Sequence, residues 1–237
     1  MAENVEVKLK NVRLSFFHGF KPQERRDDKT KELTGWNYNT SILLDKVEDA
    51  AQIDAIKEAM KKARDSQWPD KDSRPRIPAD RMCLRDGEPV DEDTGKPRGL
   101  YDGYDGCMYL SANRPVSIED QELIKAGKKD RPITIIGPRK GENGKFKPLE
   151  ENDEFAPYSG CYANVIIRVY PFSSGDYPAR INASLEAIQF CRHGTRFAGS
   201  APIDAESAFD EVEDEDDLGS SGSTGGGTAA SDDDLLG

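Results

Sequence analysis

Polar and apolar residues alternate along residues 5–17, which is the pattern of a β-strand with one buried face. The apolar residues change from odd to even positions midway along this segment. Val5, Val7 and Leu9 lie on one side of a regular strand, and Val12, Leu14 and Phe16 lie on the other. A β-bulge near Lys10 and Asn11 adds one extra residue, which would turn both apolar sets toward a single core. This segment therefore predicts a long, bulged first strand.

A helix is predicted after the second strand-like segment. Asp45 can cap a helix that continues to about Ser66, and Trp68 followed by Pro69 ends it. Apolar residues at helical spacing give this helix one buried face, formed by Val47, Ala50, Ile53, Ala59, Met60 and Ala63.

The remaining elements are short strands with one more helix. Ser117 and Asp120 form a capping box that predicts a helix from Ser117 to Ala126, with Gly127 at its end. Residues 70–106 are rich in Pro, Gly and charge and are interpreted as a long excursion. Residues 142–145 predict a hairpin turn into Phe146. Further strands are expected at 36–44, 107–113, 133–136, 161–172 and 181–191. The pattern predicts a mainly β fold, an OB-like small barrel with one or two helices.

The charge of the chain is unevenly distributed. The net charge is −12, but residues 204–237 contain twelve acidic residues and no Lys or Arg. Residues 1–203 keep 33 basic and 33 acidic residues, so their net charge is zero. The acidic run 204–217 and the Gly/Ser-rich run 219–230 cannot form a core. The sequence therefore predicts a folded domain at 1–203 and a disordered acidic tail at 204–237.

Several classes of protein do not fit this sequence. The four cysteines are scattered without a CxxC pair, so neither a disulfide scaffold nor a zinc site is expected. His18 and His193 stand outside any nucleophile motif, and the chain carries no phosphate-binding loop. No apolar run approaches the roughly 18 residues that span a bilayer, and the chain start lacks a secretory signal. We expect a cytosolic protein with no enzymatic activity, metal, cofactor or membrane partner.

Aromatic and basic residues interleave on the predicted strand 161–172. Its core face is formed by Cys161, Ala163, Val165, Ile167 and Val169. Its outer face is formed by Tyr162, Asn164, Ile166, Arg168, Tyr170 and Phe172. Bases stack on aromatic rings and cations follow phosphates, so the outer face has the chemistry of a single-strand platform. Residues 128–147 add a basic patch, with seven basic residues against two acidic ones. The candidate DNA-binding residues are Lys8, Lys10, Arg13, Trp36, Tyr38, Tyr109, Arg114, Tyr162, Arg168, Tyr170 and Phe172. The competing interpretation is structural, because such residues also form ordinary cross-strand pairs.

Residues 12–16, 38–46, 158–165 and 183–190 resemble a family of tailed-phage single-stranded DNA-binding proteins. The similarity covers about residues 5–200 and is weakest at 70–106. The resemblance implies an OB-fold and coating of single-stranded DNA by a homodimer or a cooperative array. It also implies a role in phage replication, recombination or repair, in the cytoplasm of the infected bacterial host.

The chain end independently resembles the acidic tails of replication binding proteins, which finish in carboxylates and a hydrophobic anchor. The matching residues are Asp232, Asp233, Asp234, Leu235 and Leu236. The chain departs from that pattern because it ends in Gly237 instead of an aromatic residue, which favours a phage-encoded replication or recombination protein as the partner. We expect the tail to recruit this partner and to compete with DNA for a basic groove. A merely solubilising tail is the alternative.

Three other functions remain open at this point. An acidic interaction protein or DNA mimic would spread acids over its folded surface, whereas here the excess lies in the tail. A metal-dependent nuclease or annealing enzyme would need an acidic site that no spacing identifies. An architectural protein would bind duplex DNA as well as single strands, and the sequence does not distinguish this case.

Overall fold

Five strands close a ring in the computed structural model, which describes residues 3–27, 29–90, 95, 99–174 and 177–197. These residues belong to one unit, Met1–Ala201, and the predicted tail lies outside them. The ring strands are β1 (Val5–Arg26), β2 (Leu33–Asp45), β4 (Cys107–Val116), β7 (Tyr162–Ser174) and β8 (Tyr177–Arg192). Each pairs with the next in the order β1, β2, β4, β8, β7 and back to β1, and only the β4–β8 pairing is parallel. The mainly β, OB-like barrel predicted from the sequence is confirmed.

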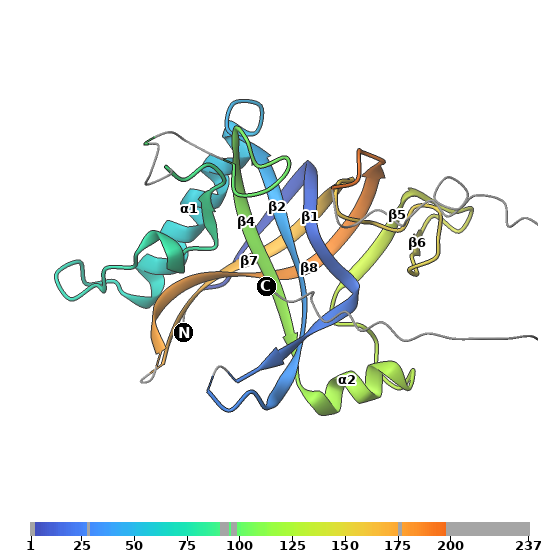
Figure 1. Cartoon of the computed structure of the whole chain (residues 1–237), viewed down its shortest axis with the longest axis horizontal. Helices are drawn as coiled ribbons and strands as arrows, with labels where there is room; N and C mark the ends of the chain where they lie inside the picture. Colours follow the sequence, from blue (N-terminus) through green and yellow to red (C-terminus); the bar gives the residue numbers. More distant parts are fainter. Residues whose placement is uncertain (1–2, 28, 91–94, 96–98, 175–176, 198–237) are drawn as a thin grey trace, which may run out of the picture. The chain divides into compact units, whose positions relative to one another are not determined.

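Smaller elements extend this ring (Figure 1). The helices are α1 (Ala50–Gln67), α2 (Ile118–Lys125) and the 3-10 turn η1 (Ala79–Arg81). Short strands are β3 (Leu84–Asp86), β5 (Thr134–Lys140) and β6 (Phe146–Pro148). In Figure 1, α2 lies at the C-terminal end of β4, and β5 and β6 continue the sheet beyond β8. No helix among the described residues is long and apolar enough to cross a membrane.

The first strand contains the predicted bulge and a second one. Asn11 has a φ of 50°, and the register against β7 shifts between Leu9 and Val12, so the apolar residues on both sides of the bulge are buried. The prediction for Phe16 is wrong. Phe16 has a φ of 47° within a second register shift, and its side chain is 46% exposed, while Ser15 is buried. The second bulge therefore turns an aromatic ring out of the core.

Helix α1 begins later than its sequence predicts. The Asp45 carboxylate accepts hydrogen bonds from the N–H groups of Val47 and Glu48, at 2.7 and 2.9 Å, in a turn that precedes the helix. Val47 and Ala50 were expected on the buried face, but both are exposed because the helix starts only at Ala50. The buried face is formed by Ile53, Ile56, Ala59 and Ala63. Trp68 ends the helix as predicted.

Local signals were more accurate for α2. The Ser117 hydroxyl accepts a hydrogen bond from the Asp120 N–H at 3.0 Å, and Gly127 follows the helix with a φ of 68°. The predicted excursion 70–106 is only partly right, because it contains η1 and β3. Cys83 and Leu84 are buried there, so this part of the segment belongs to the barrel wall.

The free edge of β8 meets three partners in turn. Ile181 forms a bridge with Met82, Ala183 and Ser184 then pair with β4, and Ala187 pairs with β5. Only two residue pairs therefore join β4 to β8, and the strands diverge on both sides of that contact. Two pockets open at these divergences, and both are lined by arginines.

Candidate nucleic-acid interface

A polar face covers the outer side of β2 and β4. On β2, Asn39 and Ser41 face outward and pair with Asn113 and Ser111 of β4. Asn37 donates a hydrogen bond to the Asn113 side-chain oxygen at 3.0 Å. The intervening residues of both strands point inward and are buried. Strands β2 and β4 occupy the places of the second and third barrel strands, whose outer face binds oligonucleotides in OB-folds. We call these five residues the polar face.

A row of aromatic rings borders the polar face. The Arg85 guanidinium lies 5.3 Å from the centre of the Tyr109 ring, and Tyr109 contacts Tyr104 at 5.5 Å between ring centres. The row continues through Tyr101 to Phe16 by edge-on contacts at 5.3 and 4.9 Å. Burial raises the pKa of the Tyr104 phenol, which hydrogen-bonds Ser15 and Ser41. Tyr101 and Phe16 form the exposed end of the row. Their rings face solvent, and the buried Tyr104 holds them in place from below.

Arg13 and Tyr162 are both candidates from the sequence, and they lie together at one end of the five-stranded barrel. Arg13 donates hydrogen bonds to the carbonyl oxygens of Thr195 and Gly160, at 2.9 and 3.3 Å. Its guanidinium lies 6.0 Å from the Tyr162 ring centre, and that of Arg192 lies 3.4 Å from it. Gly160 has a φ of 110°, and a Cβ there would lie 2.2 Å from the Thr195 oxygen, so only glycine permits this approach.

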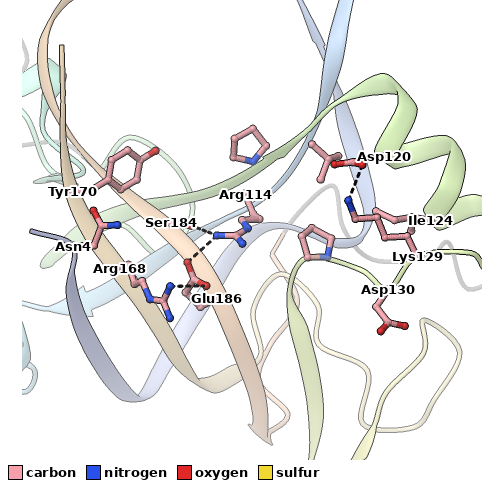
Figure 2. A pocket seen from close by; sticks show the side chains of 13 residues that line it. Asn4, Arg114, Asp120, Ile124, Lys129, Asp130, Arg168, Tyr170, Ser184 and Glu186 are labelled. Carbon is pink, nitrogen blue, oxygen red and sulfur yellow. Dashed lines mark hydrogen bonds and ion pairs between the residues drawn. The ribbon is translucent and has the colours of Figure 1, made fainter. Parts of the chain in front are cut away.

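Three further candidates meet in one pocket on the other side of the β4–β8 contact (Figure 2). Arg114 donates hydrogen bonds to the Ser184 hydroxyl and the Glu186 carboxylate, both at 3.0 Å. Arg168 approaches the second oxygen of Glu186 at 4.0 Å, and Tyr170 lines the wall. Figure 2 shows the Glu186 carboxylate between the two guanidinium groups.

The net charge of this pocket is zero. Three basic residues in its lining, Arg114, Lys129 and Arg168, are matched by three acidic ones, Asp120, Asp130 and Glu186. The Lys129 ammonium also pairs with Asp120 at 2.7 Å. Proximity of the predicted arginines therefore does not produce a basic pocket here.

The other candidates from the sequence are dispersed. Lys8 is exposed and pairs with Glu6 at 3.6 Å, and Lys10 is exposed at the first bulge. Trp36 is half-buried, with the Lys125 ammonium 4.7 Å from its ring centre. Phe172 is 39% exposed at the end of the β7–β8 hairpin, where its ring centre lies 6.5 Å from that of Tyr177. Only Phe172 of this group offers an open aromatic surface.

Tyr38 does not fit the role that the sequence analysis gave it. Its side chain is 1% exposed, and its hydroxyl hydrogen-bonds the buried Gln121 side-chain oxygen at 3.2 Å. Burial raises the pKa of this phenol. Tyr38 points into the barrel because it shares a strand face with the buried Thr40 and Ile42. Its ring is therefore a core group without a free face for a base.

Sequence reasoning missed three arginines near the polar face. Arg81, Arg85 and Arg180 line the second pocket beside the β4–β8 contact. The available signal was the short apolar run 82–84 between Arg81 and Arg85, which has the pattern of a strand flanked by cations. Arg180 has no local signal, because its neighbours in sequence are part of an ordinary hairpin.

The described residues contain no group of three or more His, Cys, Asp or Glu side chains that could hold a metal ion. Two thiols are deeply buried: burial raises the pKa of Cys83 to about 12 and that of Cys161 to about 11. All four cysteines are free thiols.

Comparison with known proteins gives consistent matches. The model of the family described as Enterobacter phage Enc34, ssDNA-binding protein, matches residues 5–219. The putative protein p50 of Acyrthosiphon pisum secondary endosymbiont phage 1 is 29% identical over 213 residues, covering 88% of this chain and 94% of the relative. The solved single-stranded DNA-binding protein from bacteriophage Enc34 in complex with ssDNA has a TM-score of 0.56 and 19% identity, over 84% of this chain and 95% of that one. Another structure of the Enc34 protein has a TM-score of 0.55 and 18% identity, over 89% and 96% of the two chains. The solved structures support the fold, and the family match covers most of the chain.

Proposed function

Because this chain belongs to the family of the Enterobacter phage Enc34 single-stranded DNA-binding protein, we propose that it binds and coats single-stranded DNA. The family is one of binding proteins rather than enzymes. The observation that carries the proposal is the polar face on β2 and β4, bordered by the aromatic row from Tyr109 to Phe16. It lies on the strands that bind oligonucleotides in OB-folds.

The surface suits a strand whose bases are exposed. Bases stack on the open rings of Phe16 and Tyr101, and base–aromatic stacking is worth about 1–3 kcal/mol per base. The amide side chains of the polar face donate and accept hydrogen bonds without requiring one base. Phe172 and Tyr177 are exposed at the β7–β8 hairpin and offer a second surface on which a base can stack. Paired bases in a duplex would not reach these rings, which favours single strands.

We propose two roles for the acidic tail, residues 204–237. Its carboxylates compete with DNA for the basic groups near the polar face. When no DNA is bound, the tail therefore covers part of the DNA-binding surface and lowers the affinity for DNA. When DNA displaces the tail, the terminal Asp232–Asp234 and Leu235–Leu236 recruit a replication or recombination protein. The charge division at residue 204 supports this proposal, since the folded part has no net charge of its own. We place these roles in phage replication, recombination or repair in the infected host's cytoplasm.

The test is fluorescence anisotropy with labelled oligo-dT and a matched duplex across a salt series. We expect tight, salt-sensitive binding to oligo-dT and weaker binding to the duplex. Truncation after Ile203 should strengthen binding, whereas a full-length control with the terminal two leucines changed to serine should leave DNA affinity unchanged. Equal affinity with and without the tail would contradict the competition. No binding of oligo-dT at low salt would overturn the function and leave the acidic interaction protein as the better explanation. Equal binding of the duplex would favour an architectural protein.

Coating further implies contact between neighbouring copies, either as a homodimer or as a cooperative array. Mass photometry of the protein alone and on long oligo-dT separates the two. A dimer in the absence of DNA supports the first, and assembly only on DNA supports the second. Strictly independent monomers on saturated DNA would contradict both.

The nuclease alternative predicts cleavage of the labelled strand with magnesium, which gel analysis of the same samples detects.

A further inference from the structure

A pocket of about 370 Å³ opens where β4 and β8 diverge on the side of β3. Three arginines from separate elements line it: Arg81 from η1, Arg85 from β3 and Arg180 from β8. Asp80 is the single acidic residue in the lining, so the side chains sum to a charge of +2. The pocket of Figure 2, on the opposite side of the same β4–β8 contact, sums to zero. Of the two, only the first has an excess of positive charge. We call it the arginine pocket.

Two arginines of this pocket carry a buried donor that is not used. The Nε atoms of Arg85 and Arg180 are buried and have no hydrogen-bond partner among the residues that the structure describes. Arg85 makes one long contact, 3.4 Å from its Nη2 to the Ser111 hydroxyl, and stacks on Tyr109. None of the three arginines forms an ion pair with any residue that the structure describes. A buried guanidinium N–H without an acceptor is costly, so an anion in this pocket would supply the missing acceptors.

The backbone holds these groups in place without the ligand. Leu84 pairs with Leu110 and Asp86 pairs with Met108, which fixes the strand on both sides of Arg85, and Met82 forms a bridge with Ile181. Leu84 is buried, so strand alternation turns Arg85 outward. A guanidinium fixed before binding loses less conformational freedom when it takes up a planar, bidentate contact.

We propose that the arginine pocket binds a phosphate group of the single-stranded DNA backbone. This deepens the proposed function, since it names the residues that contact the backbone. Ser111 and Asn113 belong both to the pocket and to the polar face, so the two surfaces are continuous. A strand held by one phosphate at Arg85 and Arg180 places the adjoining nucleotides on the polar face. A guanidinium group can donate two parallel N–H hydrogen bonds to two oxygens of one phosphate. The Nε–H groups of Arg85 and Arg180 that have no acceptor are available for such contacts.

The test compares salt dependence in variants of the full chain. For single strands, the slope of log affinity against log salt changes by about 0.7 for each phosphate contact. We expect R85Q/R180Q to flatten the slope by about 0.7 and to bind oligo-dT about tenfold more weakly. R85K/R180K keeps the charge and loses the planar fork, so it should keep the slope and recover only part of the affinity. The control is K57Q, which removes one charge from the exposed Lys57–Asp54 pair on α1 and should change neither quantity.

Two outcomes separate this proposal from the proposed function. If the wild-type chain binds oligo-dT but R85Q/R180Q has the same affinity and slope, the arginine pocket is not a backbone site. If the wild-type chain does not bind at all, the function itself fails. Circular dichroism and thermal melting of each variant show whether the fold is intact, and R81Q offers a second, more exposed position if the double variant unfolds.

A competition arm separates a DNA phosphate from a free phosphate ion. Inorganic phosphate is added against sodium chloride at equal ionic strength, with oligo-dT bound. We expect phosphate to weaken oligo-dT binding to the wild type more than chloride does, and this difference to disappear in R85Q/R180Q, because the ion and the strand compete for the same pocket. Phosphate binding to the free protein that R85Q/R180Q loses, without any weakening of oligo-dT binding, would show a free-anion site and overturn the assignment to the DNA backbone.

Discussion

Replacing Tyr38 by phenylalanine separates a core role from a DNA contact. The Tyr38 hydroxyl and the Gln121 side chain hydrogen-bond at 3.2 Å, and both residues are almost fully buried. Tyr38→Phe removes the hydroxyl and leaves the Gln121 oxygen without that partner. A net hydrogen bond is worth about 0.5–1.5 kcal/mol, and an unsatisfied buried polar group costs about 1–3 kcal/mol. We therefore expect a loss of about 2 kcal/mol in the free energy of unfolding.

Urea denaturation followed by tryptophan fluorescence measures this change, and thermal melting should show a decrease of roughly 4–8 °C. Oligo-dT affinity should stay within about twofold of the wild type, because the ring has no exposed face. The double variant Tyr38→Phe with Gln121→Leu removes both polar groups and should recover part of the lost stability. A variant of unchanged stability with strongly weakened DNA binding would refute the reasoning and return Tyr38 to the DNA-contact set.

Two further predictions follow from burial. Ile56 is fully buried on α1, so Ile56→Ala should lower the free energy of unfolding, measured by urea denaturation, by about 3 kcal/mol. A decrease of less than about 1 kcal/mol would show that α1 is not part of the core. Thiol labelling at pH 8 should modify two cysteines of the native protein quickly and two slowly, because burial holds the pKa of Cys83 at about 12 and that of Cys161 at about 11. Mass spectrometry of digested samples should place the fast sites at the half-buried Cys107 and Cys191, and early labelling of Cys83 would contradict the burial.

Local patterns in the sequence predicted much of the fold. The alternation along β7 assigned its two faces correctly, since the period of a strand is a property of the backbone alone. The capping box at Ser117 and Asp120 located the start of α2 correctly. This interaction is also local, because both of its residues lie within one helical turn. The start of α1 was placed too early because Asp45 caps a turn, and a carboxylate does this equally well in a turn or a helix.

The arrangement of the candidate site was predicted less well than the fold. Aromatic and basic residues do border a polar sheet face, and Arg13 and Tyr162 do lie together. The sequence could not show that Arg114 and Arg168 share the carboxylate of Glu186, because three strands must pair before those groups meet. Such contacts depend on register, which no local pattern specifies.

The sequence by itself determined a β-rich fold, the concentration of acidic charge in residues 204–237 and the family to which the chain belongs, because these depend on period, composition and short motifs. The tertiary structure alone decided which side of β2 is buried, so that Tyr38 became core and Asn39 surface. It also brought Arg81 and Arg85 beside Arg180, which lies far along the chain. The physical reason is that strand pairing is non-local. A bulge or a one-residue shift of register exchanges the two faces of a strand, and only the closed ring fixes that choice.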